Sequence, residues 1–277
     1  MLAELEPFLR SSKLPHLWCP GCGNGIVLGS LLRAINRVER DPNQIVIVSG
    51  IGCSSRATAY LNFDTLHTTH GRAIAFATGI KLANPNLTVI VITGDGDCTA
   101  IGGNHLIHAA RRNLDLTVLV FNNNIYGMTG GQYSPTTPTE GRATTAPYGN
   151  IERPFDLIEL AKAAGATYLG RATAYHNKLL TRLLVNAIIN KGFSLVEAIT
   201  HCPVGFGKRN GIAVPADMLK WQRDHAVTVQ AAAQMTQEEL ADKVIIGELY
   251  SNPEPEYTEQ YSQLVARAQN LGGGMGS

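Results

Sequence analysis

The sequence predicts an α/β protein with a doubly wound, mostly parallel sheet and a C-terminal extension. Three apolar runs rich in β-branched residues end in glycine or asparagine, at residues 44–52, 87–96 and 116–124. Their apolar character is continuous, which is typical of strands buried on both faces. Helical patterns fall before and between them, at residues 25–38, 71–83 and 104–113. This alternation is typical of a parallel sheet covered by helices on both faces.

The same alternation continues in the second half of the chain. Helices are expected at residues 155–165 and 177–190, and strands at 166–173 and 193–200. No linker and no internal repeat interrupts the region from residue 15 to 205. We therefore expect one domain over residues 1–205.

The pattern weakens after about residue 203. "CPVGFGKRNG" is rich in turn residues, "SNPEPEYTEQY" (251–261) is acidic and contains proline, and "NLGGGMGS" (270–277) is typical of a flexible tail. Residues 206–277 are therefore expected to form an extension that packs on the domain or on a partner. A disordered tail is the alternative.

Composition and charge exclude several classes of protein. Hydrophobic residues make up 44% of the chain and charged residues 16%, and the formal net charge is +1. A nucleic-acid-binding surface requires a clear basic excess, so none is expected. No apolar run reaches the roughly 18 residues of a membrane span, and no signal-peptide core begins the chain. A cytoplasmic location is therefore expected, where cysteines more often serve metals or catalysis than disulfides.

Polar residues follow two neighbouring strands of the predicted sheet. The strand at 87–93 ends in "GDGDC", which contains Asp95, and the next strand ends in "NNNIYG". Ligands of open parallel sheets bind beyond the carboxyl ends of the strands. Carboxylate, amide and carbonyl oxygens suit a Mg²⁺ ion that also bridges phosphates, and Gly94 and Gly96 allow the backbone to approach a bulky anion. An ordinary turn followed by an asparagine-rich loop is the alternative.

The whole span from residue 94 to 124 resembles the GDG…NN motif of thiamine-diphosphate (TPP) enzymes. The resemblance implies that the sheet is of the TPP diphosphate-binding type. It also implies that Asp95 and Asn123 bind Mg²⁺ through their side chains, and Ile125 through its carbonyl. Asn122 and Asn124 are alternative candidates for this role, because the motif can be aligned on any of the three consecutive asparagines.

Four of the five cysteines are expected to converge. Cys53 and Cys202 follow predicted strands, and Cys19 and Cys22 lie in "WCPGCGNG", a turn before the first helix. Four separate sulfur ligands suit a [4Fe–4S] cluster. A zinc site and unligated core cysteines are the alternatives. Cys98 lies inside the diphosphate loop and is interpreted as a small buried filler.

Together these segments resemble the β subunits of the 2-oxoacid:ferredoxin oxidoreductases. The matching stretches cover roughly residues 15 to 210 and are "WCPGCGNG", "SGIGCSSR", "HTTHGRAIAFATGIKLA", the GDG…NN block, "YGMTGGQYSPTTP" and "HCPVGFGKRN". The resemblance implies that Cys19, Cys22, Cys53 and Cys202 hold one [4Fe–4S] cluster near TPP. It implies oxidative decarboxylation of a 2-oxoacid with coenzyme A, giving acyl-CoA, CO₂ and two reduced ferredoxins, in a reaction that can also fix CO₂.

Substrate and partners follow from the same resemblance. The "CPVGFGKRN" segment and the short chain are most similar to the 2-oxoglutarate type; pyruvate or another 2-oxoacid is the alternative. An α subunit is implied, because the glutamate that activates TPP lies on a second, pyrimidine-binding domain, and an (αβ)₂ assembly is expected. Two further hypotheses stay open: a non-redox TPP carboligase or decarboxylase, and an iron–sulfur electron carrier with a degenerate cofactor fold.

Two further residues are candidates for the reaction itself. His70, in "LHTTHGRA", is expected between a loop and a helix start, against the cofactor or the 2-oxoacid, although a capping or core histidine is the commoner case. Arg56 is expected to bind a substrate carboxylate, with a solvated arginine as the alternative. The full predicted cofactor-binding set is Gly52, Cys53, Ser54, His70, Gly94, Asp95, Gly96, Asp97, Asn123 and Thr129.

Overall fold

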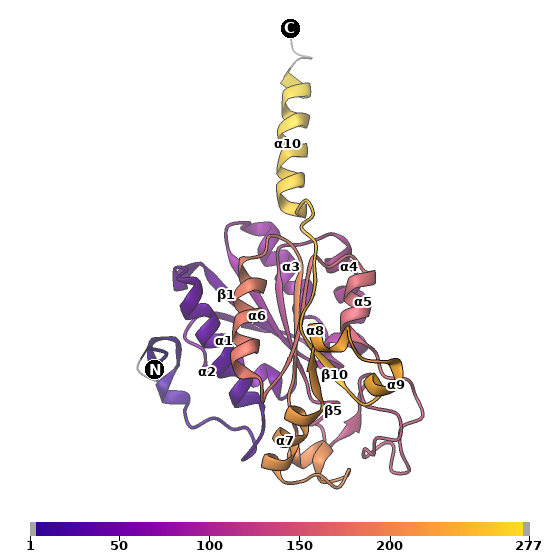
Figure 1. The fold of residues 1–277 in the computed structure, drawn as a ribbon. Coiled ribbons are helices and arrows are strands. Elements are labelled where there is room, and N and C mark those ends of the chain that lie inside the picture. Colours follow the sequence, from indigo (N-terminus) through magenta and orange to yellow (C-terminus); the bar gives the residue numbers. More distant parts are fainter. Residues whose placement is uncertain (1–3, 274–277) are drawn as a thin grey trace.

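The fold is built on an eight-stranded sheet with the strand order β2-β1-β3-β4-β8-β7-β10-β9 (Figure 1). The computed structural model describes residues 4–273. The first six strands of that order are mutually parallel, whereas β10 runs antiparallel to β7. The predicted doubly wound, mostly parallel sheet is therefore confirmed.

The strands of the main sheet are β1 (Ile45–Ser49), β2 (Asp64–His67), β3 (Thr88–Gly94), β4 (Thr117–Asn122), β7 (Tyr168–Thr173), β8 (Ser194–Ile199), β9 (Ala226–Thr228) and β10 (Val244–Ser251). A separate small hairpin consists of β5 (Ile125–Tyr126) and β6 (Gln132–Tyr133). The helices are α1 (Asn24–Val38), α2 (Ala57–Tyr60), α3 (Ala73–Ala83), α4 (Gly103–Arg111), α5 (Leu157–Ala163), α6 (Asn177–Ile189), α7 (Pro215–His225), α8 (Val229–Ala232), α9 (Gln237–Leu240) and α10 (Tyr257–Gly273).

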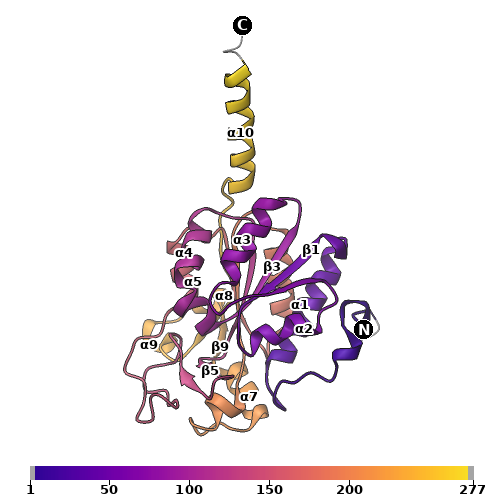
Figure 2. The same ribbon diagram turned by 180° about the vertical axis from the view of Figure 1, so that it is seen from behind.

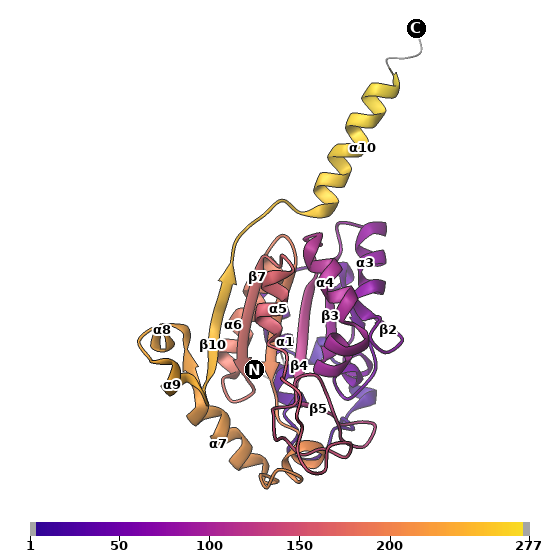
Figure 3. The same ribbon diagram turned by 90° about the vertical axis from the view of Figure 1, so that its right-hand side faces the viewer.

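Two apolar cores lie on opposite faces of the sheet, so each inner strand is buried on both sides (Figures 2 and 3). Ile90 and Ile92 of β3 face the core that contains α1 and α6. Val89 and Val91 of the same strand face the core that contains α3, α4 and α5. Because neighbouring side chains of a strand point to opposite faces, a strand in this position must be apolar at every residue. This is the physical origin of the continuous apolar runs.

The five predicted strands and five predicted helices are all present, with ends that shift by up to three residues. The edge strand β2 was not predicted: its residues 64–67 are mostly exposed and lack a continuous apolar run. None of the helices in the described part of the chain is long and apolar enough to cross a membrane.

The residues of the predicted extension add two strands and a projecting helix. β10 pairs with β7 and thereby lengthens the sheet, whereas α10 leaves the body of the protein and points away from it (Figure 1). The boundary at residue 205 stays a prediction. The predicted flexible tail at 270–277 overlaps the last residues of α10, and residues 274–277 lie outside the described part.

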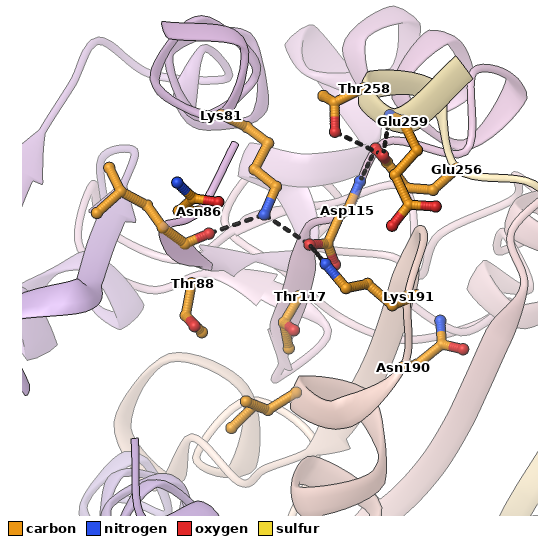
Figure 4. A network of polar contacts seen from close by, with 12 residues as sticks. Lys81, Asn86, Thr88, Asp115, Thr117, Asn190, Lys191, Glu256, Thr258 and Glu259 are labelled. Atoms are coloured by element: carbon orange, nitrogen blue, oxygen red, sulfur yellow. Dashed lines mark hydrogen bonds and ion pairs between the residues drawn. The ribbon is translucent and has the colours of Figure 1, made fainter. Parts of the chain in front are cut away.

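A polar network fixes the amino-terminal edge of the sheet and the root of α10 (Figure 4). The ammonium of Lys81, only 2% exposed, lies 2.5 Å from Asp115 Oδ2 and donates to the carbonyl of Leu87 at 2.8 Å. Glu256 Oε1 accepts from the Asp115 amide at 3.1 Å, and its Oε2 accepts from the amide of Glu259 at 3.0 Å. This carboxylate therefore caps the first turn of α10.

The register of the inner strands aligns their carboxyl ends. Gly94 at the end of β3 is paired with Phe121 of β4, and Asn122 of β4 is paired with Ile199 of β8. The loops that follow β1, β3, β4 and β8 therefore emerge side by side at one edge. This is the edge opposite to the Lys81–Asp115 network.

Candidate functional site

A cavity of about 310 Å³ opens between the loops that follow β1, β3 and β4. All ten residues of the predicted cofactor-binding set line it, and so does Ile125. These residues come from four separate stretches of sequence, 52–54, 70, 94–97 and 123–129, which the strand order brings together. The remaining lining residues are Ile51, Phe121, Tyr126, Gly127 and Met128.

Asp95 is the only carboxylate in this cavity that lacks a cationic or imidazole partner. Its Oδ2 accepts from the hydroxyls of Ser134 at 2.5 Å and Thr136 at 2.7 Å, and its Oδ1 has only a long contact of 3.4 Å with the Asn123 amide. Burial raises the pKa of the Asp95 carboxyl, and the hydroxyl donors oppose this shift. A buried carboxylate with one committed and one nearly free oxygen is well suited to a divalent cation.

The three consecutive asparagines have different surroundings, which separates their possible roles. Asn122 is buried: its Nδ2 donates to Glu197 Oε1 at 2.7 Å, and its Oδ1 accepts from the Thr136 hydroxyl at 3.1 Å. Asn124 has a left-handed backbone (φ 61°) and does not line the cavity. Of the three, only Asn123 lines the cavity together with Asp95. This placement favours Asn123 as the magnesium ligand, and the role itself stays a prediction.

Glu197 holds the segment of three asparagines in place through a hydrogen bond to Asn122. It lies on β8, is 2% exposed, and accepts from Arg171 Nε at 2.6 Å as well as from Asn122. By holding the amide of Asn122, it orients the Asn122 Oδ1 toward the amide of Asn124, 3.1 Å away, and so closes a turn. Asn123 is the central residue of this turn and lines the cavity, and its Oδ1 accepts from the Ile125 amide at 3.3 Å.

His70 is held by a buried carboxylate. Its Nδ1 lies 2.6 Å from Asp97 Oδ1, which also accepts from the amide of Gly71 at 2.6 Å. The other oxygen of Asp97 accepts from the Thr93 hydroxyl at 2.9 Å. Asp97 lines the cavity, but both of its oxygens are occupied by the protein. It therefore orients His70, whose ring packs edge-on near Tyr126.

Two other predicted residues have surroundings that the sequence did not indicate. The hydroxyl of Thr129 lines the cavity and donates to Gln132 Oε1 at 2.6 Å. Arg56 lies outside this cavity, exposed, and lines a second one that contains the cysteines. Cys53 lies between the two cavities, so Arg56 is separated from Asp95. That Arg56 binds a substrate carboxylate stays a prediction.

The second cavity, of about 150 Å³, is the cysteine cavity. Cys19, Cys22, Cys53 and Cys202 all line it, and all are free thiols. Cys98 is buried elsewhere, in the core beneath α3 and α4. The cysteines thus divide as the sequence indicated, into four that converge and one that fills the core.

Burial disfavours the charged form of two thiols in this cavity. It raises the pKa of Cys22 to about 12, against a backbone hydrogen bond from Asn24 that lowers it, and the pKa of Cys53 to about 11, although Arg56 lowers the latter; neighbouring thiol groups add to both increases. A bound metal centre would supply the positive charge that stabilises thiolates here. One sulfur already has a donor: the amide of Gly205 lies 3.2 Å from Cys202 Sγ.

The kind of metal site that these cysteines form stays a prediction. In the described residues 4–273, no group of three or more histidine, cysteine, aspartate or glutamate side chains is arranged to hold a metal ion. Zinc needs four ligands around one point, whereas a [4Fe–4S] cluster needs four sulfurs that each bind a different iron. The four cysteines that line this cavity supply that number of sulfurs.

The two cavities share a wall. Cys53, Asn123, Gly127 and Met128 line both of them. A Cβ placed on Gly127 would lie 3.6 Å from both Cys53 Sγ and Cys202 Sγ, so a side chain there would grow into this wall. A cofactor in the first cavity would therefore lie beside Cys53, with the shared wall between it and the other three cysteines.

The chain is similar to thiamine-diphosphate enzymes and to subunits of 2-oxoglutarate synthases. Residues 50–198, more than half of it, match the family model described as "Thiamine pyrophosphate enzyme, C-terminal TPP binding domain". The chain is 50% identical over 263 residues to the 2-oxoglutarate synthase subunit KorB of Methanocaldococcus jannaschii, covering 95% of this chain and 97% of that protein. It is 55% identical over 226 residues to the KorB subunit of Archaeoglobus fulgidus, covering 81% and 82%.

The chain belongs to the KorB family of 2-oxoglutarate synthase subunits. A solved structure of the 2-oxoglutarate:ferredoxin oxidoreductase from Magnetococcus marinus, with 2-oxoglutarate, coenzyme A and succinyl-CoA bound, matches with a TM-score of 0.85 and 33% identity. That match covers 96% of this chain and 90% of the other. The first cavity thus belongs to a TPP-binding domain, and the KorB assignment confirms the predicted family and enzyme class.

Several residues of the site escaped the sequence argument. Ser134 and Thr136, which bind Asp95, and Glu197, which holds Asn122, were not singled out. Ser134 and Thr136 lie in "SPTTP", and a hydroxyl-rich segment after a glycine-rich turn is a weak signal for such a role. Glu197 is the one charged residue in the apolar run 193–200, and a charge inside a buried strand is a usable signal.

Proposed function

We propose that this chain is the subunit of a 2-oxoglutarate:ferredoxin oxidoreductase that holds TPP, Mg²⁺ and a [4Fe–4S] cluster. The observation that supports this most directly is the shared wall of the two cavities. An enzyme that removes electrons one at a time from a TPP-bound substrate needs its cluster next to the cofactor, and Cys53 belongs to both sites. A carboligase or decarboxylase without redox chemistry has no use for a four-cysteine cavity there.

The residues of the first cavity fit the diphosphate end of TPP with its magnesium ion. Asp95 supplies the anionic oxygen, and Asn123 and the carbonyl of Ile125 supply neutral ones. A Cβ built on Gly96 would lie 2.3 Å from the ring of Tyr126, so any side chain at this position would collide with that ring. Glycine therefore lets the backbone pass close to the ring. His70, held by Asp97, is placed to donate a proton or a hydrogen bond inside the cavity.

The cluster would be held by Cys19, Cys22, Cys53 and Cys202. When bound, it supplies one-electron acceptance, which TPP alone lacks. The chain keeps four sulfurs around one cavity. It also supplies two hydrogen bonds around them: the Gly205 amide donates to Cys202 Sγ, and Trp18 Nε1 donates to the Cys53 carbonyl at 2.7 Å. Such outer contacts orient the ligands.

An α subunit has to complete the first cavity. TPP is activated by a glutamate at its aminopyrimidine ring, and no glutamate lines this cavity. The helices that follow His70 and Asp97 carry exposed apolar residues, Phe76 on α3 and Ile107 on α4. Ile101, just before α4, is also exposed, and a Cβ on Gly71 would touch it. An exposed apolar surface beside an incomplete cofactor cavity is a natural interface for the pyrimidine-binding domain.

The reaction proposed is 2-oxoglutarate + CoA + two oxidised ferredoxins → succinyl-CoA + CO₂ + two reduced ferredoxins + H⁺, and its reverse. The substrate and the acyl carrier follow the names of the relatives and the ligands of the Magnetococcus marinus structure. A cytoplasmic (αβ)₂ complex is part of the same proposal, because reduced thiols are needed to assemble the cluster.

The decisive experiment compares the chain alone with the complex. Purified anaerobically, the single chain should contain iron and sulfide but should not oxidise any 2-oxoacid. After addition of the α subunit, CoA-dependent reduction of methyl viologen should appear, and 2-oxoglutarate should exceed pyruvate in kcat/KM. Turnover by this chain alone would refute the two-subunit site, and a preference for pyruvate would refute the substrate.

A further inference from the structure

Residues 19–22, which we call the CPGC loop, are attached to the rest of the protein at both ends. At one end, Trp18 Nε1 donates to the carbonyl of Cys53 at 2.7 Å. At the other end, the Gly23 amide donates to the carbonyl of His201 at 3.1 Å. His201 belongs to the loop after β8, which supplies the fourth cysteine of the cavity. The CPGC loop is therefore bonded to both of the other segments that supply cysteines.

The contact between Gly23 and the loop after β8 leaves no room for a side chain. A Cβ built on Gly23 would lie 2.2 Å from Thr200 Oγ1 and 2.8 Å from His201 Nδ1, which is far inside van der Waals contact. Thr200 and His201 are each only 4% exposed. The Thr200 amide also donates to the carbonyl of Asn122 at 2.8 Å, which ties this loop to the end of β4. Any side chain at Gly23 would therefore push the CPGC loop away from Cys202.

The ring of His201 contacts the CPGC loop a second time. Burial lowers the pKa of the His201 imidazole, and a hydrogen bond between the ring and the backbone of Gly21 opposes this shift. A neutral imidazole has a single N–H donor. Because Nδ1 has no hydrogen-bond partner within residues 4–273, the nitrogen that bonds to Gly21 is Nε2. His201 thus holds the residues on both sides of Cys22, Gly21 through its ring and Gly23 through its carbonyl.

We propose that His201 is a positioning residue for the cluster, which holds Cys22 beside Cys202 before iron binds. The inference rests on the proposed function, because it takes the cluster to occupy the cysteine cavity. A cluster that assembles on three separate segments has to order each segment that is not already in place, and this ordering costs conformational entropy. Contacts that fix the segments in advance lower that cost, and they also orient the ligands.

The first test inserts a methyl group between the two loops. In Gly23→Ala the new Cβ falls against Thr200 and His201, so the CPGC loop has to move. Gly25→Ala is the matched control, because a Cβ on Gly25 would lie 3.4 Å from His16 Nε2, an ordinary contact. The full-length chains are freed of metal with a chelator and then incubated anaerobically with iron, sulfide and a thiol reductant. Iron content and visible absorption follow the formation of the cluster over time.

The second test changes His201 itself. His201→Ala removes the ring, whereas His201→Gln places an amide nitrogen near the position of Nε2 and should keep the bond to Gly21. His176→Ala is the matched control, because His176 follows the neighbouring strand β7 and does not line the cysteine cavity. The ring of His176 bonds instead to Thr173 Oγ1 at 2.8 Å. The melting temperature of each metal-free chain is measured, and the rates are compared at a temperature at which all of the chains are folded.

Cluster formation should be about tenfold slower in Gly23→Ala and His201→Ala, and their final iron content should be lower. His201→Gln and the two controls should form the cluster at the rate of the unmodified chain. Unchanged rates in both Gly23→Ala and His201→Ala would overturn the proposal. Equal slowing in the controls would also overturn it, by showing that assembly responds to any loss of stability. An unmodified chain that takes up no iron and sulfide would instead refute the proposed function.

Discussion

The two edges of the sheet hold charges in opposite ways. At the amino-terminal edge, Lys81 pairs with Asp115, and Glu256 accepts from the amides of Asp115 and Glu259, so that each charge has a partner within the chain. At the carboxyl-terminal edge, Asp95 is buried with one oxygen almost free, and four thiols line one cavity. The first arrangement is complete within the chain, whereas the second leaves a carboxylate oxygen without a close partner.

This difference indicates what each edge is for. A complete buried network holds the fold in one arrangement, and breaking it costs stability. An incomplete one costs stability without its ligand, because burial raises the pKa of Asp95, Cys22 and Cys53. Substitutions at the two edges should therefore affect different properties.

The largest effect is expected at the cysteines. Cys202→Ser should abolish the cluster, because a serine hydroxyl does not replace a thiolate as an iron ligand, whereas Cys98→Ser should retain it. Iron and sulfide analysis of anaerobically purified protein measures this. TPP binding by the αβ complex should survive in both variants. Full iron content in Cys202→Ser would contradict the four-cysteine assignment.

The next effect concerns Asp95. Asp95→Asn should weaken Mg²⁺-dependent TPP binding to the αβ complex on the order of a thousandfold, which corresponds to about 4 kcal/mol. The melting temperature of the unliganded chain should not fall, since the variant no longer buries a carboxylate. Calorimetric titration and thermal unfolding provide the two readouts. A lower melting temperature with unchanged affinity would make Asp95 a structural residue.

The reverse pattern is expected at the amino-terminal edge. Lys81→Met keeps the length of the side chain but leaves Asp115 with only the ammonium of Lys191, 3.6 Å away. The free energy of unfolding should fall by about 3 kcal/mol. Denaturant unfolding of the chain measures this loss, with the exposed Lys178→Met as the control. Affinity for Mg²⁺ and TPP should stay the same in the folded variant; if it drops, the two edges are not independent.

The smallest effect is expected at Glu197, which supports the open edge without lining it. Glu197→Gln hardly changes the size of the side chain, but its NH₂ group would face a hydrogen-bond donor, either Asn122 Nδ2 or Arg171 Nε. The turn that presents Asn123 should loosen, and the affinity for Mg²⁺ should fall about tenfold. Magnesium titration at saturating TPP tests this. Glu159→Gln, an exposed site on α5, is the matched control. Equal affinities in the two variants would show that Glu197 only stabilises the sheet.

The sequence alone determined the fold class and which residues line the two cavities. Continuous apolar runs predict strands that are buried on both faces, because an inner strand between two helix layers has no face exposed to solvent. GDG and CPGC are short motifs whose residues act together with their neighbours along the chain, so a few consecutive residues are enough to identify them. Because parallel strands end at a common edge, even the convergence of Cys53, Cys202 and Asp95 was predictable.

Only the tertiary structure decided which side chains meet. Ser134 and Thr136 bind Asp95 across 39 and 41 residues, and Glu197 binds Asn122 across 75. It also decided that Arg56 lines the cysteine cavity and that β10 joins the sheet as an antiparallel strand. Periodicity and motif spacing report only what happens within a few residues along the chain. Contacts between distant segments depend on how whole layers pack, and local patterns carry little of that information.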